Sequence, residues 1–367
     1  MKKTKAIIAL LLVAALGVGA LGAANAGAAQ SHASKAGSRK AKKPAKGVYW
    51  GAWIGPQLTG TEAPWDMSAV SQFQGLVGKS PSLIEFSSPF RTCNGGSCED
   101  NKFPTGAMQS IRSYGAIPVF SWGSQPNSAT LNDPDFSLQN IANGSLDSYI
   151  RQFATEAKAW GHPFFLRFNW EMNGTWFLWS EGLNGNSPGS YVAAWRHVHD
   201  IFASVGANNA TWVWCPYAGA SGARAQLGKY YPGDEYVDWT CLDGYNWGGP
   251  NSTRPSPWRS FDWLFATAYR KVTKKIAPNK PMMLGELASN GGGKPKATWI
   301  NRMFAALPKR YPRVRGLVWF NCPDRTMSWT LESSAAGLRA FSKGIQDRRY
   351  LSPRFNSLAE SPIPVSR

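Results

Sequence analysis

The chain is poor in the side chains that most often bind metal ions or act as nucleophiles. Its 367 residues include four histidines and five cysteines, and no cysteine pair has the spacing of a zinc site. His197 and His199 stand two positions apart, which on a helix turns their rings about 200° from each other, so they cannot share an ion. No Ser/His/Asp set, glycine-rich phosphate loop or dinucleotide fingerprint occurs in a suitable context. We therefore predict neither a metal nor another cofactor.

Long apolar runs are also absent beyond the first 26 residues, so no membrane span is predicted there. Near the start, Lys2, Lys3 and Lys5 precede an apolar run from Ala6 to Leu21, and Ala24-Asn25-Ala26 follows as a cleavage pattern. This order is typical of a secretory signal peptide, and the run is too short to span a bilayer. We predict a signal peptide over residues 1–26 and a protein that is secreted, extracellular or associated with the cell wall.

Acidic residues are scarce beside basic ones, 22 against 40, and the formal net charge is +18. Residues 27–46 contain no aromatic side chain and consist mainly of Ala, Ser, Gly, Lys and Arg, which predicts a disordered linker. Its basic side chains are Lys35, Arg39, Lys40, Lys42, Lys43 and Lys46. We expect a solvated tether or a weak attraction to anionic cell-wall polymers or acidic lipids. The signal peptide argues against nucleic acid, and we expect no membrane insertion and a monomer.

The five cysteines all follow the predicted cleavage site. Cys93 and Cys98 bracket Asn-Gly-Gly-Ser, a flexible turn that an oxidising compartment can close with a disulfide. Cys215, Cys241 and Cys322 are left, and because their number is odd we expect at least one free, buried thiol.

From residue 47 onward, short apolar strands alternate with amphipathic helical stretches. The hydrophobic period changes from 2 to 3.6 between them. The predicted strands are Tyr49–Ile54, Leu83–Ser87, Ile117–Trp122, Phe164–Trp170, Thr211–Cys215, Trp239–Tyr245, Met282–Leu287 and Gly316–Asn321. Eight such strands with helices between them favour an α/β fold, a (β/α)8 TIM barrel, as a single catalytic domain over residues 47–367.

Two glutamates end predicted strands of this barrel. Glu171 follows the fourth strand, and Glu286 lies near the end of the seventh. Catalytic groups of such barrels lie at the carboxyl ends of the strands, and glycoside hydrolysis needs a carboxylic acid and a carboxylate on either side of the sugar. The alternative is that each glutamate only forms a salt bridge, for example with Arg167. For two glutamates at equivalent strand ends we favour catalysis.

Tryptophan is abundant, with 18 residues in the chain. Flat aromatic faces stack on the apolar faces of sugar rings, so tryptophans at strand ends predict sugar subsites. Those at strand ends or in the following loops are Trp53, Trp122, Trp170, Trp176, Trp179, Trp247 and Trp319. Those on predicted helix faces are assigned to the core, namely Trp160, Trp195, Trp263 and Trp299.

Several long segments resemble glycoside hydrolase family 26, chiefly endo-β-1,4-mannanases with some β-1,3-1,4-glucanases and β-1,3-xylanases. The resemblance is carried by the run from Arg167 to Trp179, with Glu171-Met-Asn-Gly at its centre, by Tyr191–Val198, by Thr211–Trp214 and by Tyr231–Tyr245. It implies a barrel with Glu171 as acid/base, Glu286 as nucleophile and no metal. It also implies that Tyr245 hydrogen-bonds the nucleophile, that Asp243 supports the sugar site, and that Trp176, Trp319 and Trp122 line subsites. Arg167 and Trp170, beside the acid/base glutamate, complete the predicted substrate-binding residues.

One position departs from the family pattern, which usually has a histidine just before the acid/base glutamate. This chain has Trp170 there, so the identity of the sugar is open, and Asn169 is a candidate for the lost polar contact. The resemblance implies a retaining endo-β-1,4-mannanase first. A β-1,3-1,4-glucanase or xylanase of the same family is an alternative, and so is a glycan-binding barrel without catalysis. The joint presence of both glutamates favours the enzyme.

Overall fold

A computed structural model describes residues 47–127, 130–248, 256–291, 293–323 and 327–366. The predicted signal peptide and linker lie outside these residues. Among the helices that are described, none has both the length and the apolar character needed to cross a membrane.

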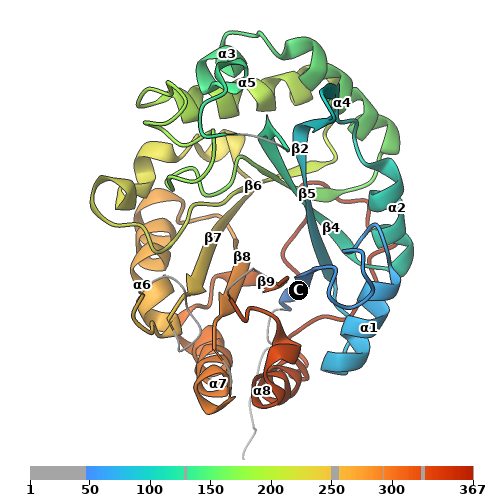
Figure 1. The fold of residues 1–367 in the computed structure, drawn as a ribbon, viewed down its shortest axis with the longest axis vertical. Helices are drawn as coiled ribbons and strands as arrows, with labels where there is room; N and C mark the ends of the chain where they lie inside the picture. Colours follow the sequence, from blue (N-terminus) through green and yellow to red (C-terminus); the bar gives the residue numbers. More distant parts are fainter. Residues whose placement is uncertain (1–46, 128–129, 249–255, 292, 324–326, 367) are drawn as a thin grey trace, which may run out of the picture. The chain divides into compact units, whose positions relative to one another are not determined.

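Eight parallel strands form the centre of the described part of the chain. They are β1 (Tyr49–Ile54), β2 (Leu83–Asn94), β4 (Ile117–Pro126), β5 (Phe164–Phe168), β6 (Ala210–Trp214), β7 (Trp239–Asn246), β8 (Met282–Ser289) and β9 (Val314–Asn321). β1 pairs with both β2 and β9, so the sheet closes on itself (Figure 1). The predicted (β/α)8 barrel is confirmed.

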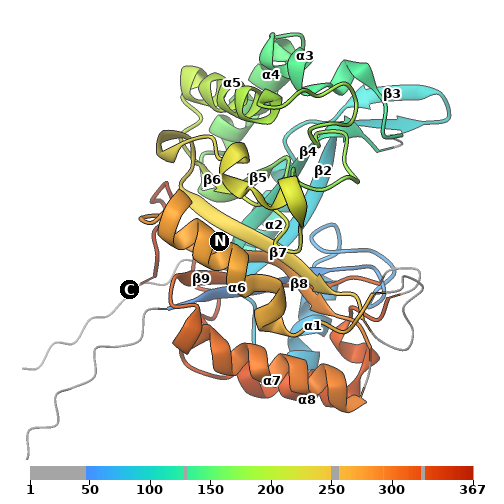
Figure 2. The ribbon, with the colours of Figure 1, turned by 90° about the vertical axis from the view of Figure 1, so that its left-hand side faces the viewer.

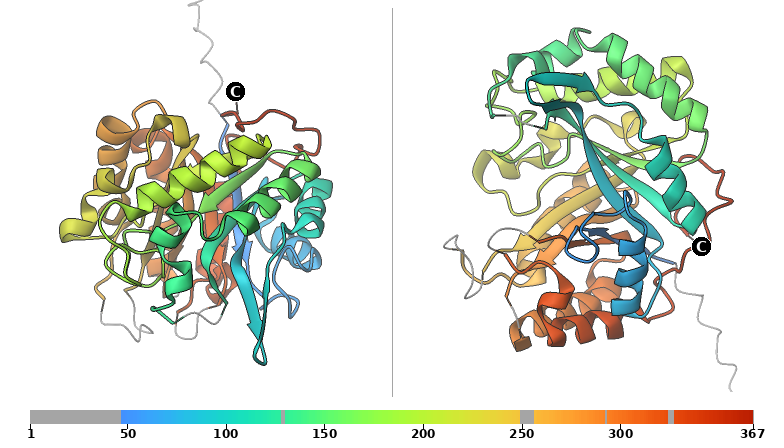
Figure 3. Two further views of the ribbon diagram at one scale, coloured as in Figure 1. Left: turned by 90° about the horizontal axis from the view of Figure 1, so that it is seen from above. Right: turned by 45° about the vertical axis from the view of Figure 1, so that its right-hand side comes forward.

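The helices form a layer outside the strands, as both views of Figure 3 show. They are α1 (Ser68–Val77), α2 (Thr105–Tyr114), α3 (Leu138–Ala142), α4 (Asp147–Trp160), α5 (Ser190–Val205), α6 (Phe261–Lys271), α7 (Gly293–Arg310) and α8 (Ala335–Ile345). α4 is typical: Ile150, Phe153 and Ala157 lie on its buried face, and Gly161 ends it with a φ of 75°. These apolar faces cover the outside of the barrel.

Two of the differences from the predicted strand bounds concern the carboxyl ends of β2 and β5. β2 continues to Asn94 and pairs with an antiparallel strand, β3 (Ser97–Asp100), in a hairpin that projects from the barrel (Figure 2). β5 ends at Phe168 rather than Trp170, because Asn169 and Glu171 adopt φ values of 45° and 51° that cannot continue an extended strand.

The disulfides correct one expectation about the cysteines. The predicted Cys93–Cys98 bond is present in the hairpin. Cys215, directly after β6, and Cys241 on β7 are also joined, inside the barrel. Cys322 lies outside both bonds, but its side chain is only half-buried, so the expected buried thiol is wrong in that respect.

The barrel interior is apolar at one end and charged at the other. Tyr49, Leu83, Phe165, Cys241 and Met283 belong to an apolar cluster that draws on all eight barrel strands. Because side chains alternate along a strand, positions two residues further on also face inward. Two residues after Leu83, Phe165 and Cys241 lie the buried charged residues Glu85, Arg167 and Asp243. The alternation therefore places three charges inside the carboxyl end of the barrel.

Candidate active site

The two predicted catalytic glutamates meet at the carboxyl end of the barrel. Glu171 lies in the turn after β5 and Glu286 within β8, and each is 6% exposed. Carboxylate oxygens of Glu171, Glu286 and Asp243 lie within 4.8 Å of one another. Glycosidases that retain configuration have carboxyl groups about 5–5.5 Å apart, whereas inverting enzymes have them about 6.5–9.5 Å apart. The close approach therefore matches the retaining geometry.

Glu171 is presented by a strained turn. Its φ of 51° is rare for a residue with a side chain, and such conformations persist where surrounding contacts hold them. Its backbone N–H donates to the Cys215 carbonyl oxygen at 2.7 Å, which ties the turn to the end of β6. The turn directs the carboxyl group toward β8 instead of continuing along β5.

Arg167 links the carboxylates from below. Its Nη1 donates to Glu286 Oε1 at 3.0 Å and to Glu85, and its Nη2 donates to Asp243. Nη1 also donates to Ser121 Oγ at 3.1 Å, and the Ser121 hydroxyl in turn donates to Glu85. All of these groups except Glu286 are fully buried. Glu286 therefore forms the salt bridge with Arg167 that the sequence offered as the alternative to catalysis. Glu286 also lines the cavity described below, so the salt bridge does not exclude a catalytic role.

Gly285 makes room for this ion pair. A Cβ atom at Gly285 would lie 2.4 Å from Cys241 Sγ, 2.8 Å from Asp243 Oδ1 and 3.2 Å from Arg167 Cζ. Those distances leave no space for any side chain. The Gly-Glu sequence at the end of β8 is therefore a packing requirement of the charged layer.

Asp243 and Tyr245, on the neighbouring strand β7, hold Glu286 in place. Asp243 Oδ1 accepts the backbone N–H of Glu286 at 2.7 Å, next to a register shift between β7 and β8. The Tyr245 hydroxyl donates to Glu286 Oε2. Burial raises the pKa of Tyr245 well above its usual value, so the hydroxyl keeps its proton and remains a donor. Glu286 thus receives donors at both carboxylate oxygens.

The environment of Glu171 favours the protonated acid. Burial raises its pKa to about 8, and the nearby charge of Glu286 adds to the effect. The indole N–H of Trp176 donates to Glu171 Oε2 at 2.6 Å and acts in the opposite direction, lowering the pKa. A carboxyl group that stays protonated near neutral pH, beside a second carboxylate held by Arg167 and Tyr245, is the asymmetry that an acid and a nucleophile need.

A cavity of about 470 Å³ opens above these groups and is mostly aromatic. Its lining residues are Trp53, Trp170, Glu171, Trp176, Phe177, Tyr217, Tyr245, Trp247, Glu286, Phe320 and Trp329. The structure thus brings Trp170, Trp176 and Tyr245 from the predicted site to one cavity, along with Trp53 and Trp247. Arg167 and Asp243 lie beneath it, in contact with Glu286.

Two predicted subsite tryptophans are not at the cavity. Trp122 is fully buried and stacks on Phe153 of α4 at a centroid distance of 4.1 Å. Trp319 is fully buried against Phe341 of α8, and its Nε1 donates to the Trp329 carbonyl oxygen at 3.2 Å. The expectation that they line subsites is corrected: both rings face the helix layer.

Other tryptophans also refine the sequence interpretation. Trp179 lies behind Trp170 and donates its Nε1 proton to the Trp170 carbonyl oxygen at 2.6 Å. Of the four assigned to the core, Trp160, Trp195 and Trp299 are buried, whereas Trp263 is 53% exposed. The Trp263 assignment is wrong because Trp263 lies at the solvent side of α6, with Arg259 stacked over its ring at 3.7 Å.

Asn169 does not supply a polar group to the cavity. Its Oδ1 accepts the Ser124 N–H at 2.8 Å and its Nδ2 donates to Ser124 Oγ at 2.8 Å. Both ends of the amide are thus used to join the turn after β5 to β4. Trp170 packs on Phe177 and Trp179 and contributes an apolar wall where the family pattern has a histidine.

Several contributing residues were not predicted. Glu85 was missed although a charge inside the apolar run Leu83–Ser87 is the same signal that marked Glu171. Phe177, Tyr217, Phe320 and Trp329 were missed as lining residues because they lie in loops or at a strand end whose direction no periodicity reveals.

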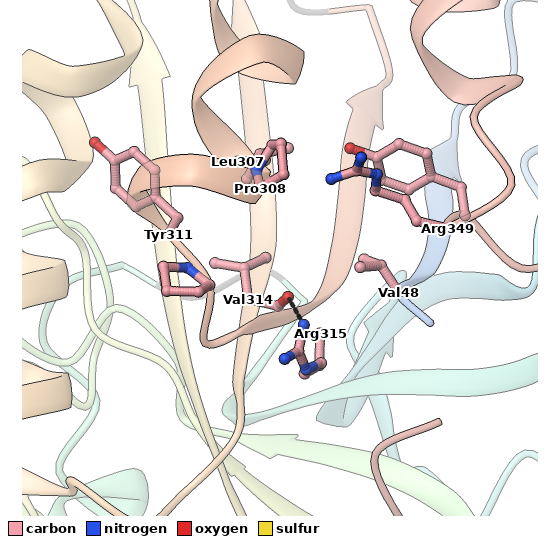
Figure 4. Close-up of a pocket in the computed structure, with 9 residues that line it drawn as sticks. Val48, Leu307, Pro308, Tyr311, Val314, Arg315 and Arg349 are labelled. Carbon is pink, nitrogen blue, oxygen red and sulfur yellow. Dashed lines mark hydrogen bonds between the residues drawn. The ribbon is translucent and has the colours of Figure 1, made fainter. Parts of the chain in front are cut away.

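The oxygens of the carboxylate cluster are largely occupied by protein donors. Asp243 accepts from Arg167 and from the Glu286 backbone, and Glu286 accepts from Arg167 and Tyr245. These donors and the guanidinium charge suit a pair of catalytic carboxylates better than a cation site. A second cavity, of about 310 Å³, lies by the end of α7 and the start of β9 (Figure 4). None of the predicted site residues lines it.

A parallel barrel with two adjacent carboxylates and an aromatic cavity at its carboxyl end has the architecture of a glycoside hydrolase. The family model of glycosyl hydrolase family 26 matches residues 44–305. The chain belongs to this family.

Two curated relatives and one solved structure illustrate the family. Endoglucanase H of Acetivibrio thermocellus is 32% identical over 302 residues, which is 82% of this chain and 30% of that protein. Mannan endo-1,4-beta-mannosidase A and B of Caldalkalibacillus mannanilyticus is 31% identical over 158 residues, or 41% of this chain and 26% of that protein. The chain thus spans less than a third of either relative. A Cellulomonas fimi endo-beta-1,4-mannanase double mutant matches with a TM-score of 0.61 and 19% identity, covering 84% of this chain and 72% of that one.

Proposed function

We propose that this family 26 glycoside hydrolase is a retaining endo-hydrolase of a β-linked polysaccharide, with Glu286 as nucleophile and Glu171 as acid/base. The observation that carries the proposal is the close approach of the two carboxyl groups, with carboxylate oxygens within 4.8 Å. This close approach is nearer to the spacing of retaining enzymes than to the wider spacing that admits an attacking water, so direct attack by Glu286 is favoured.

In the proposed mechanism each glutamate acts in two steps. In the first, a Glu286 oxygen bonds to the anomeric carbon, the bond to the leaving oxygen breaks, and the Glu171 proton moves to that oxygen. In the second, Glu171, now a carboxylate, takes a proton from water as the water oxygen bonds to the anomeric carbon and Glu286 departs. Tyr245 and Arg167 orient Glu286, and Trp176 contacts Glu171. Two inversions give net retention.

The resemblance names β-1,4-mannan as the first substrate to test. Trp170 leaves the choice of sugar open, because it replaces the family's usual histidine with a ring that stacks on sugars but accepts no hydrogen bond. A β-glucan is the second candidate, and the match to Endoglucanase H over 82% of this chain favours it. A xylan is the third candidate.

The direct test is reducing-sugar release from mannan, mixed-linkage glucan and xylan by the wild type, Glu171→Gln and Glu286→Gln. We expect hydrolysis of at least one polymer and losses of at least about 10²-fold in both variants. An aryl glycoside with a dinitrophenyl leaving group needs no proton from Glu171, so Glu171→Gln should be much less impaired in releasing that group, whereas Glu286→Gln should stay inactive.

Three outcomes would count against the proposal. Wild-type turnover by either variant removes that glutamate from catalysis. An initial α-configured product, observed by proton NMR, excludes retention. Glycan binding without any turnover by the wild type favours a non-catalytic glycan-binding barrel.

We also propose that residues 1–26 direct secretion and that the basic residues 27–46 act as a tether with weak affinity for anionic cell-wall polymers. The support is the charge and apolar pattern of the sequence. N-terminal sequencing of protein from the culture medium should begin at Gly27. Intact protein confined to the cytosol would contradict this.

A further inference from the structure

Lys296 on α7 is fully buried, which is unusual for a lysine. A buried ammonium is costly unless polar partners replace its water. Within the described chain no carboxylate forms a salt bridge with Lys296. Uncharged hydrogen-bond acceptors must therefore replace the water around the ammonium group.

Those partners all belong to one short segment after β9. Lys296 Nζ donates to the Ser328 carbonyl oxygen at 2.5 Å, the Thr330 carbonyl oxygen at 2.7 Å and Ser333 Oγ at 3.1 Å. The Trp329 carbonyl oxygen is 3.4 Å away. We name residues 328–333 the Trp329 segment. Its backbone curls around the ammonium so that several carbonyl oxygens point inward at one cation.

The opposite side of the Trp329 segment is tied by two amides. Asn290 Oδ1, just after β8, accepts the Ser328 N–H at 3.0 Å, and Asn321 Oδ1, at the end of β9, accepts the Leu331 N–H at 2.7 Å. Trp319 of β9 also donates to the Trp329 carbonyl oxygen, and Gln57 and Asn321 donate to the Glu332 carboxylate. Lys296 is nevertheless the group that binds the Ser328 and Thr330 carbonyl oxygens together, so its removal leaves both without this donor.

The Trp329 segment places an aromatic wall against the active site. The Trp329 ring lies 5.2 Å from the Tyr245 ring and 4.9 Å from the Trp247 ring, measured between centroids. Tyr245 in turn donates its hydroxyl proton to Glu286. A shift of Trp329 would therefore change the wall of the cavity and free Tyr245 to move away from the nucleophile.

We propose that Lys296 is a positioning residue, whose ammonium gathers the carbonyl groups of the Trp329 segment and so holds Trp329 against Tyr245 in the cavity wall. Its kinetic consequence rests on the proposed function, because it acts through Tyr245 and Glu286. Its structural consequence, the order of the segment, does not. Substituting Lys296 alone, with residues 328–333 unchanged, should therefore alter the order of the segment.

The proton on Lys296 matters to this arrangement. An ammonium has three donors, whereas a neutral amine has two and a lone pair that would face a carbonyl oxygen. Burial lowers the pKa of Lys296 to about 7, and the charge of Glu332 opposes that change. Gly337, which packs on the lysine stem from α8, adds no charge. Because a lysine released by an opened segment would regain its ordinary, higher pKa, protonation favours opening, and the segment should be held more firmly as the pH rises through 7.

The test compares Lys296→Met with Lys294→Met, a control at an exposed lysine on the same helix. Hydrogen exchange at the Ser328 and Leu331 amides should be at least about tenfold faster in Lys296→Met and unchanged in the control. With a polysaccharide substrate, KM should rise about tenfold because the cavity wall shifts, and kcat should fall as well because Tyr245 no longer positions Glu286. The wild-type KM should fall between pH 6 and 8, and this change should disappear in Lys296→Met.

Unchanged exchange in a folded Lys296→Met protein would overturn the proposal. So would an equal effect of Lys294→Met. If Lys296→Met does not fold, Lys296→Gln retains two N–H donors and should give an intermediate exchange rate; wild-type exchange in that variant would equally refute the role. If the wild type hydrolyses no β-glycan, the proposed function fails while hydrogen exchange still decides the role of Lys296.

Discussion

Replacing Trp176 by Phe removes one hydrogen bond from Glu171, the proposed acid/base, and leaves an aromatic ring in the cavity. The indole N–H donates to Glu171 Oε2 at 2.6 Å, and this bond lowers the pKa of a carboxyl group that burial has raised to about 8. Because the bond stabilises the carboxylate more than the acid, its loss raises the pKa of Glu171 further. The basic limb of the kcat/KM profile, which reports the loss of the catalytic proton, should move to higher pH.

The size of the shift follows from the strength of such a bond. A hydrogen bond to a charged group contributes about 1.5–3 kcal/mol, and one pKa unit corresponds to about 1.4 kcal/mol. Trp176 is 43% exposed, so water can partly replace its N–H in the variant. We therefore expect the basic limb to rise by about one unit rather than two.

The assay is kcat/KM on a soluble β-glycan from pH 4 to 10, with stability checked at each pH. Trp53→Phe is the control, because Trp53 lines the same cavity and packs on Phe320 at 5.7 Å. Its basic limb should coincide with that of the wild type. A limb that stays in place or moves to lower pH in Trp176→Phe would refute the account of the Glu171 environment.

Two further predictions concern the charged layer beneath the cavity. Arg167→Met leaves Glu85 and Asp243 buried without their cation, so urea denaturation should show a loss of about 3–5 kcal/mol at neutral pH, and a loss below 1 kcal/mol would contradict the layer. Gly285→Ala forces a Cβ atom to within 2.4 Å of Cys241 Sγ, so we expect about 1–3 kcal/mol of destabilisation and reduced activity. Full activity with unchanged stability would show that Cys241, Asp243 and Arg167 can shift to accommodate the added methyl group.

Much of the barrel was predictable because its signals are local. The eight strands have short apolar runs, and each predicted run overlaps an observed strand. The end of β5 was less predictable, because the left-handed conformations of Asn169 and Glu171 are imposed by contacts such as the Glu171 N–H to the Cys215 carbonyl oxygen. The Cys215–Cys241 bond joins neighbouring strands, and spacing alone left their pairing open.

The side-chain directions of the tryptophans depended on packing. A tryptophan at a strand end looks the same in the sequence whether it faces the cavity or the helix layer. Trp53 faces the cavity, whereas Trp122 and Trp319 pack on Phe153 and Phe341. The choice follows from the helix residues opposite each ring, and those lie far away along the chain.

The sequence alone determined the barrel, the family and the choice of Glu171 and Glu286 as the candidate catalytic pair. Strand periodicity and a charge at the end of an apolar strand can both be recognised within a few neighbouring residues. The tertiary structure decided how those glutamates differ. Burial and Trp176 surround one, and Arg167 and Tyr245 hold the other. A pKa depends on the distances between groups and on the water excluded around them, and both arise only when the closed barrel brings β5, β7 and β8 together.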